Sequence, residues 1–265
     1  MAPAPLVLVT GASSGIGREL ARGFARRGAR LVISARSEER LERLARELEA
    51  ACAGEAIAIA TDLARPGGGE ALAGALERRG LHPDGLVNNA GAGIAGPFVE
   101  NDPDRIVRII RLNVEAPTRL ARSLLPAMVE RRRGFVLNVA STAAFLPGPG
   151  MAVYYATKAY LLSWSEALAE ELRGTGVTVT ALCPGPTRTA FQQRAGMEDT
   201  RLMRTRLLAV MDAAPVAAGA LEGLDRGRRV VIPGWLNRAG VLAARLAPRA
   251  VLLRLVARLN RRAPA

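Results

Sequence analysis

Lysine is almost absent from this sequence of 265 residues. Of its 37 basic residues only Lys158 is a lysine, and the other 36 are arginines. Because the chain uses arginine everywhere else, the single ammonium group indicates a position that a guanidinium cannot serve. Lys158 follows Tyr154 by one helical turn, and residues i and i+4 of a helix share a face. We therefore predict that these two side chains lie together.

A lysine beside a phenol favours the phenolate and would lower the pKa of Tyr154 from its ordinary value of about 10. Tyr154 would then donate or accept a proton near neutral pH. Taken alone, the pattern Y-x-x-x-K is more typical of a solvated helix face. Other motifs in the sequence are needed to distinguish a functional pair from a solvated helix face.

Cysteine and histidine are also scarce. Cys52 and Cys183 are isolated and have no metal-binding spacing, so we expect no metal site and a reduced, cytoplasmic protein. The single histidine, His82, is expected in a surface loop, and a histidine-based catalytic triad would depend on it alone. No apolar run approaches the roughly 20 residues of a membrane-spanning helix. The residues before Leu6 do not resemble a signal peptide.

Acidic residues are too few to balance the arginines, and the formal net charge is +13. Such a charge attracts nucleic acids and anionic membranes. Along residues 37–44, however, arginines are interleaved with glutamates, which is typical of a solvated helix face with i,i+4 ion pairs. We therefore do not expect nucleic acid as a partner.

Short apolar runs alternate with segments of helical periodicity along most of the chain. This alternation predicts an α/β fold, a doubly wound (Rossmann) parallel sheet of about seven strands in one domain, residues 1–233. One helix is expected over residues 18–27 and another over residues 153–173. The strands are expected at residues 6–9, 30–34, 57–60, 85–87, 134–139, 177–182 and 230–232.

Residues 234–265 form a predicted C-terminal extension of two short, basic, amphipathic helices separated by Pro248. These helices would pack on the catalytic domain, make a contact between copies in a homo-oligomer, or lie on an anionic membrane surface. We favour packing, and the other two arrangements stay open.

A glycine-rich turn, residues 10–17, lies between the first predicted strand and the first predicted helix. Strand, glycine turn and helix are the context that a phosphate-binding loop requires. The spacing T-G-x-x-x-G-x-G resembles the glycine motif of the short-chain dehydrogenase/reductase family, which implies a nicotinamide dinucleotide as cofactor. The contacts expected from this loop are Gly11, Ser13, Ser14, Gly15, Ile16 and Gly17.

The end of the second strand predicts which dinucleotide binds. An acid at this place binds a ribose 2′-hydroxyl, whereas an arginine accommodates a 2′-phosphate. The sequence has Ala35 and Arg36 there. We therefore predict NADP(H) in preference to NAD(H), with Glu38 and Glu39 as alternative partners for the ribose.

Three further segments match the family, and the resemblance implies cofactor contacts from each. Asp62 after the third strand would contact the adenine, although it suits equally well an N-cap of a helix beginning near Pro66. Asparagines at the next strand end, in the string N-N-A-G, can also tie neighbouring strand ends together. The string P-G-x-x-x-T after the sixth strand would pass the nicotinamide carboxamide. The contacts implied by the last two strings are Asn89, Ala90, Gly91, Pro184, Gly185 and Thr189.

Four candidate catalytic residues occur in the order and at the spacing of the family: Asn113, Ser141, Tyr154 and Lys158. Asn113 would hold a relay water, or else only cap a break in a helix. Ser141 would hydrogen-bond a substrate carbonyl, although a serine after a strand is often a cap. Lys158 would bind the nicotinamide ribose, so Tyr154 and Lys158 count among the cofactor contacts too.

The resemblance implies reversible hydride transfer between NADP(H) and a small-molecule carbonyl or secondary alcohol. Residues 190–211 contain Phe191, Met197, Met203 and Met211, which suits a lid over a lipophilic substrate such as a ketone, a hydroxysteroid-like compound or a 3-oxoacyl chain. The same residues would also suit a core. Two other functions stay open: a dinucleotide-binding sensor or scaffold without turnover, and a binder of anionic surfaces through the arginine-rich tail.

Overall fold

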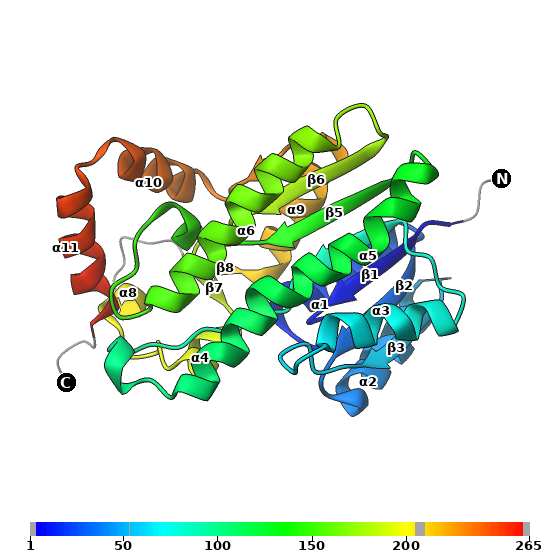
Figure 1. Ribbon diagram of the computed structural model, residues 1–265, viewed down its shortest axis with the longest axis horizontal. Coiled ribbons are helices and arrows are strands. Elements are labelled where there is room, and N and C mark those ends of the chain that lie inside the picture. Colours follow the sequence, from blue (N-terminus) through cyan, green and yellow to red (C-terminus); the bar gives the residue numbers. More distant parts are fainter. Residues whose placement is uncertain (1–3, 53, 205–209, 262–265) are drawn as a thin grey trace.

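A parallel sheet of seven strands forms the centre of the protein, in the order β3-β2-β1-β4-β5-β6-β9. The structure, a computed structural model, describes residues 4–52, 54–204 and 210–261. It confirms the predicted doubly wound α/β fold, with helices on both faces of the sheet (Figure 1). The strands are β1 (Leu6–Thr10), β2 (Arg30–Ala35), β3 (Ala56–Ala60), β4 (Gly85–Asn88), β5 (Gly134–Val139), β6 (Val177–Leu182) and β9 (Val230–Val231).

Alternation along the buried strands separates two apolar layers, because successive strand side chains point to opposite faces. Val7 and Val9 of β1 belong to one core, and Leu6 and Leu8 to the other. The first core is completed by α1 (Gly15–Arg26), α2 (Glu38–Ala51) and α9 (Ala213–Asp225). The second is completed by α3 (Gly68–Arg78), α5 (Ala116–Glu130) and α6 (Ala152–Glu171).

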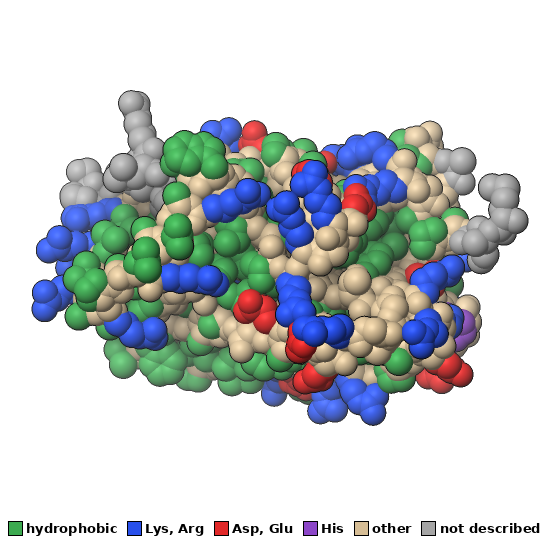
Figure 2. Space-filling view, turned by 90° about the horizontal axis from the view of Figure 1, so that it is seen from above, with side chains coloured by type: hydrophobic (Ala, Val, Ile, Leu, Met, Phe, Trp, Pro, Cys, Tyr) green, Lys and Arg blue, Asp and Glu red, His purple; other side chains and the backbone are tan. Residues whose placement is uncertain are grey.

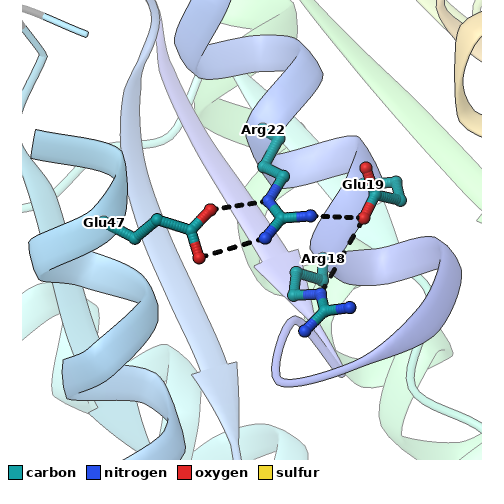
Figure 3. A network of polar contacts seen from close by, with 4 residues as sticks. All are labelled: Arg18, Glu19, Arg22 and Glu47. Carbon is teal, nitrogen blue, oxygen red and sulfur yellow. Dashed lines mark hydrogen bonds and ion pairs between the residues drawn. The ribbon is translucent and has the colours of Figure 1, made fainter. Parts of the chain in front are cut away.

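A network of ion pairs joins α1 to α2 on the outside of the first layer (Figure 3). The Nε and Nη2 atoms of Arg22 donate to the two carboxylate oxygens of Glu47 at 2.7 and 3.0 Å, and its Nη1 donates to Glu19 at 2.7 Å. On α2, Arg43 pairs with Glu39 at 3.2 Å, which confirms the predicted i,i+4 pairing. Part of the arginine excess therefore serves ordinary surface pairing.

The long helical region after β4 contains a change of helical pitch. α4 (Pro103–Ile110) begins at Asp102, whose carboxylate caps two backbone N–H groups, and it continues through a π-helical segment, Arg111–Glu115, into α5. The helix is not broken at Asn113, so the alternative that this residue only caps a helix break is wrong. Asn113 lies in the π-helical segment, and such segments often occur at functional sites. Short helical segments elsewhere are Phe98–Glu100, Thr142–Phe145, α7 (Phe191–Ala195) and α8 (Arg201–Arg204).

The C-terminal residues form α10 (Trp235–Leu246) and α11 (Arg249–Asn260), with Pro248 as the N-cap of α11. Both helices lie at the end of the molecule toward which the strands point, at the left in Figure 1. Val241 and Val256 are buried, and Asn260 donates from Nδ2 to Pro149 O at 3.0 Å. Packing, the favoured arrangement, agrees with these contacts. The boundary at residue 233 stays a prediction.

Two smaller expectations are also answered. His82 is exposed in the loop before β4, and both cysteines of the chain are free thiols. Within the described ranges, no helix combines the length and the apolar character needed to cross a bilayer.

Candidate active site

A cavity of about 1070 Å³ opens at the carboxyl ends of the strands. Such strand ends are where open α/β sheets bind their ligands. All predicted site residues line it except Gly17 and Asn113, which lie behind its wall. The lining members of the predicted set are Gly11, Ser13, Ser14, Gly15, Ile16, Arg36, Asp62, Asn89, Ala90, Gly91, Ser141, Tyr154, Lys158, Pro184, Gly185 and Thr189.

The glycine turn packs too tightly for larger residues. Gly11 has a φ of 65°, and a Cβ on it would lie 2.8 Å from Ala90 Cα. Gly15 has a φ of 58°, and a Cβ there would lie 2.8 Å from a methyl group of Thr189. Glycine supplies both the left-handed backbone and the close approach. The turn leads into α1, which begins at Gly15, three residues earlier than predicted, so its first N–H groups face the cavity.

Asparagine side chains tie the strand ends together, as the sequence suggested. Asn89 donates from Nδ2 to Thr10 O at 2.9 Å and to Gly11 O at 3.2 Å. Asn88 donates to Asn138 on β5 at 2.8 Å. The Asn89 amide therefore holds the glycine turn in place. Asn89 also lines the cavity, and its contact with a cofactor stays a prediction.

Tyr154 and Ser141 meet on the cavity wall. Ser141 follows β5 with extended backbone, and its Oγ accepts from Ala143 N at 3.1 Å, so the serine is a cap as well as a wall residue. Burial raises the pKa of Tyr154 well above its ordinary value, and a hydrogen bond from Ser141 opposes that rise only in part. The predicted lowering of this pKa is therefore wrong for this structure. A raised pKa keeps the phenol protonated at neutral pH, which suits a proton donor.

Lys158 is buried one turn along α6 from Tyr154, which confirms that the two side chains lie together. Its Nζ atom lies 5.8 Å from the centroid of the Tyr154 ring and donates to Val139 O at 2.7 Å. Burial lowers the pKa of Lys158 to about 8. A Cβ on Gly91 would lie 3.5 Å from this Nζ, so the ammonium faces the backbone of the N-N-A-G string.

Asn113 is fully buried behind the cavity wall and makes three hydrogen bonds. Its Oδ1 accepts from Ala92 N at 3.0 Å, and its Nδ2 donates to Ala92 O and to Thr157 Oγ1, each at 2.9 Å. Thr157 Oγ1 in turn donates to Tyr154 O at 2.8 Å. Asn113 thus links Ala92, the residue after the N-N-A-G string, to the helix that carries Tyr154. Sequence reasoning missed Thr157, although it lies inside the Y-x-x-x-K motif.

Three arginines gather at the far side of the glycine turn. Arg36, Arg40 and Arg194 all line the cavity, and Arg194 donates to Ser14 Oγ at 3.2 Å. Burial lowers the pKa of Arg194, and the positive charges of Arg36 and Arg40 lower it further. The sequence flagged only Arg36, because Arg194 comes from α7, far along the chain.

Asp62 lines the cavity and also closes a turn. Its Oδ1 accepts from Ala64 N at 3.0 Å, and its Oδ2 accepts from Arg108 at 3.0 Å. Burial alone would raise the pKa of Asp62, but these two hydrogen bonds hold it below the ordinary value. α3 begins at Gly68 with Gly67 as its N-cap, so Asp62 is not the cap of that helix, and the alternative that began it near Pro66 is wrong.

The opposite end of the cavity is apolar, and much of it comes from α10 and α11. The Phe191 ring is tilted by 44° against the Tyr154 ring, with 5.2 Å between their centroids, and Met197 and Met203 also line the cavity. Met211 instead pairs with Thr187 where β7 (Thr187–Arg188) meets β8 (Met211–Asp212). Residues 205–209 of the expected lid lie outside the described part of the chain. The apolar wall residues from the tail include Leu236, Val241, Val251, Leu252, Leu255, Val256 and Leu259.

The polar end of this cavity fits a dinucleotide. The crowded glycine turn brings backbone N–H groups and the start of α1 to one wall, which suits a pyrophosphate. The buried ammonium of Lys158 and the hydroxyl of Tyr154 occupy the wall nearest the ends of β5 and β6. A pyrophosphate, a ribose and a reacting carbonyl therefore each have chemically suitable partners.

Comparison with known proteins agrees with this geometry. The family model described as short chain dehydrogenase matches residues 5–199. A short-chain dehydrogenase from Sphingobium yanoikuyae, solved in complex with NADPH, is 38% identical with a TM-score of 0.81, over 94% of this chain and 95% of that one. A bulky-bulky ketone specific alcohol dehydrogenase from Comamonas testosteroni is 33% identical with a TM-score of 0.76, over 93% and 96% of the two chains. Ketoacyl reductase HetN of Nostoc sp. is 35% identical over 85% of this chain and 77% of its own.

The chain therefore belongs to the short-chain dehydrogenase/reductase family, whose members are oxidoreductases acting on alcohol and carbonyl groups. Several curated relatives are longer than the part that matches. The matched part covers 58%, 61% and 51% of three of them.

Proposed function

We propose that this chain catalyses reversible hydride transfer between NADP(H) and the carbonyl or secondary alcohol carbon of a lipophilic small molecule. The observation that carries the proposal is the convergence of Ser141, Tyr154 and Lys158 on one wall of a cavity whose other wall is the glycine turn. A nicotinamide bound in that cavity supplies or accepts the hydride.

In the direction of reduction, the protein orients the carbonyl and protonates its oxygen. Ser141 and Tyr154 both line the cavity, and their hydroxyl groups would each donate a hydrogen bond to that oxygen that strengthens as negative charge develops. The raised pKa of Tyr154 keeps its proton available until the oxygen becomes basic.

Lys158 supports this step from beneath the tyrosine. Its ammonium can reach the hydroxyl groups of a ribose and, when charged, favours a phenolate on Tyr154 after the proton has left. Asn113 holds the backbone of Ala92 and, through Thr157, the backbone of Tyr154. Asn113 would therefore hold a relay water, as its family position implies, and would also position the backbones of Ala92 and Tyr154.

A preference for NADP(H) is supported by the charge at the adenosine end. Arg36 and Arg40 line the cavity there, whereas Glu38 and Glu39, the alternative ribose partners, do not. Glu39 is instead paired with Arg43. If kcat/KM with NADH equalled or exceeded that with NADPH, this preference would be refuted.

A lipophilic substrate is supported by the apolar walls contributed by α7, α10 and α11. Similar proteins include enzymes named for bulky ketones and for ketoacyl groups, and both kinds of carbonyl are apolar beside the reacting carbon. We also propose that the chain forms homo-oligomers and works in the reducing cytoplasm, where its two free thiols would persist.

The experiment is a panel of ketones and 3-oxoacyl esters of increasing chain length, followed by the absorbance of NADPH. Tyr154→Phe is expected to lower kcat by about 1000-fold, because the proton donor is lost, while NADPH fluorescence shows nearly unchanged binding. Turnover at the wild-type rate would refute the mechanism. Binding of NADPH without turnover of any carbonyl would favour the alternative function, a dinucleotide sensor or scaffold.

A further inference from the structure

We propose that α10 and α11 dock this protein on an anionic lipid surface, so that the mouth of the cavity opens onto the lipid. The significance of a cavity that opens onto lipid rests on the proposed function, whereas docking itself does not. Both helices are twelve residues long, and short basic amphipathic helices can lie in the plane of a bilayer interface.

The first observation is the concentration of exposed apolar side chains on the two helices. Among the described residues, seven of the twelve large hydrophobic side chains that are exposed belong to α10 and α11. Trp235, Leu242 and Leu246 are 74%, 60% and 79% exposed and follow one another at helical spacing. Exposed apolar patches of this kind mark interaction surfaces.

The second observation is the charge of the same segment. After Asp225 the sequence contains ten arginines and no acidic residue. Arg249, Arg254 and Arg258 on α11 are exposed. In Figure 2 the end of the molecule that carries these helices, at the left, shows hydrophobic side chains beside arginines. An apolar surface fringed with cations complements the anionic headgroups and acyl chains of a lipid leaflet.

The third observation is that the exposed surface continues into the cavity. Leu236, Val251 and Leu255 line the cavity and are also 42%, 54% and 51% exposed. A lipophilic molecule held in a bilayer could pass along this apolar path without crossing water. The cavity and the docking surface are therefore two sides of the same helices.

Two buried asparagines hold these helices against the site. Asn237 packs on Gly185, where a Cβ would lie 2.3 Å from Asn237 Oδ1, and its Nδ2 donates to Pro233 O at 2.8 Å. Asn260 donates to Pro149 O and lies 3.5 Å from the hydroxyl of Tyr155, the neighbour of Tyr154. The surface is therefore attached to the segments that surround the catalytic residues.

A second copy of the chain fits this surface less well than an anionic lipid does. A two-fold contact would set the same patch against itself. Both sides would then bring arginines and no acids from residues 226–265, and these like charges would repel one another. Anionic lipid satisfies the apolar and the charged residues at once.

The test is sedimentation with vesicles of phosphatidylcholine, with and without phosphatidylglycerol, in the absence of cofactor. The wild type is expected to bind the anionic vesicles and to be released by high salt. Arg249→Ser/Arg254→Ser/Arg258→Ser is expected to weaken binding by about 100-fold, because each basic residue near an anionic surface contributes about a factor of five. Trp235→Ser/Leu242→Ser/Leu246→Ser should weaken binding to the same vesicles as well, since apolar insertion is lost.

Matched controls separate docking from general charge and from misfolding. Arg65→Ser/Arg78→Ser/Arg79→Ser removes the same charge from exposed positions outside the tail and should bind as the wild type does. Val107→Ser/Ile110→Ser removes exposed apolar surface from α4 and should also bind normally. Equal loss in tail variants and controls would overturn the proposal. So would unchanged binding in both tail variants, or a tail surface that proves on sedimentation to be the contact of a dimer.

Enzyme assays keep this proposal distinct from the proposed function. None of the six substituted tail residues lines the cavity, so turnover of a water-soluble carbonyl should be unchanged in both variants. With a long-chain carbonyl dissolved in anionic vesicles, kcat/KM should fall together with binding. Binding without turnover in the wild type would refute the enzyme assignment alone, and turnover without binding would refute docking alone.

Discussion

The two ends of the cavity differ in the elements and side chains that form them. At the polar end, short side chains project from strand ends that hydrogen bonds tie together, as Asn89 ties the N-N-A-G string to Thr10 and Gly11. At the apolar end, the wall is a pair of helices whose attachment depends on a few buried groups, among them Asn237 and Asn260. The proposed catalytic residues therefore come from strand ends and from α6, whereas the proposed substrate wall comes mainly from the C-terminal helices.

This difference has an energetic reason. When a substitution removes one partner of a buried hydrogen bond, the other partner is left unsatisfied, which costs about 1–3 kcal/mol. Substitutions at the polar end are therefore expected to be severe. An apolar wall tolerates substitution and changes mainly which molecules fit.

The largest effect is expected for Lys158→Arg. The ammonium is buried and donates to Val139 O at 2.7 Å, and a planar guanidinium fork does not reproduce the contact of a point charge on a flexible stem. We expect kcat/KM to fall by about 1000-fold, since proton transfer and cofactor placement both depend on this group. The control is Arg46→Lys, the opposite exchange at an exposed position of α2, which should leave activity unchanged. Near-normal steady-state activity of Lys158→Arg would refute the role given to the lysine.

The next largest effect concerns the arginines at the adenosine end. Arg36→Asp places a carboxylate where a 2′-phosphate would lie and offers a partner for a 2′-hydroxyl. The ratio of kcat/KM for NADPH to that for NADH should fall by about 100-fold. Arg43→Asp, on α2 just after Arg36 but away from the cavity, should leave the ratio unchanged. Equal shifts in both variants would show that only net charge matters.

A smaller effect is expected in the pH dependence of stability. The folded protein releases the Lys158 proton near pH 8, whereas the unfolded chain keeps it to about pH 10.5. Between these values the unfolded state binds more protons, so this lysine's contribution to the free energy of unfolding rises with pH. Relative to Lys158→Met, the wild type should gain about 2 kcal/mol between about pH 7 and pH 10.

Urea unfolding of both proteins across this range measures the difference. The raised pKa values of Tyr154, Tyr155 and Cys183 lower stability at the alkaline end, but all three groups are present in both proteins. A difference that did not change with pH would mean that Lys158 titrates in the folded protein as it does in water.

The smallest effect is expected at the apolar end. Leu252 lines the cavity, so Leu252→Ala should lower kcat/KM by about tenfold for long-chain carbonyls and leave short ones unaffected. Leu253 is the neighbouring residue, is exposed and does not line the cavity. Leu253→Ala should therefore leave the whole chain-length profile unchanged. A loss that is uniform across chain lengths would show that Leu252 supports the fold rather than the substrate.

Much of the polar end could be predicted because its residues lie in short strings at strand ends. Parallel strands bring their carboxyl ends to one edge, so a string after one strand must face the strings after its neighbours. This places Ser141, Tyr154 and the glycine turn around one cavity. The pKa of Tyr154 could not be predicted in this way, because it depends on burial by segments that are distant in sequence, including Phe191.

Local sequence patterns were enough to predict the order of strands and helices, the glycine turn and the pairing of Tyr154 with the single lysine. These features depend on local periodicity and on contacts within one helical turn. Three features became visible only in the folded chain. Arg194 lines the cavity together with Arg36 and Arg40, Thr157 connects Asn113 to Tyr154, and the C-terminal helices form part of the cavity wall. Each of these contacts joins residues far apart in the chain, and they form only when the sheet and its helices have packed.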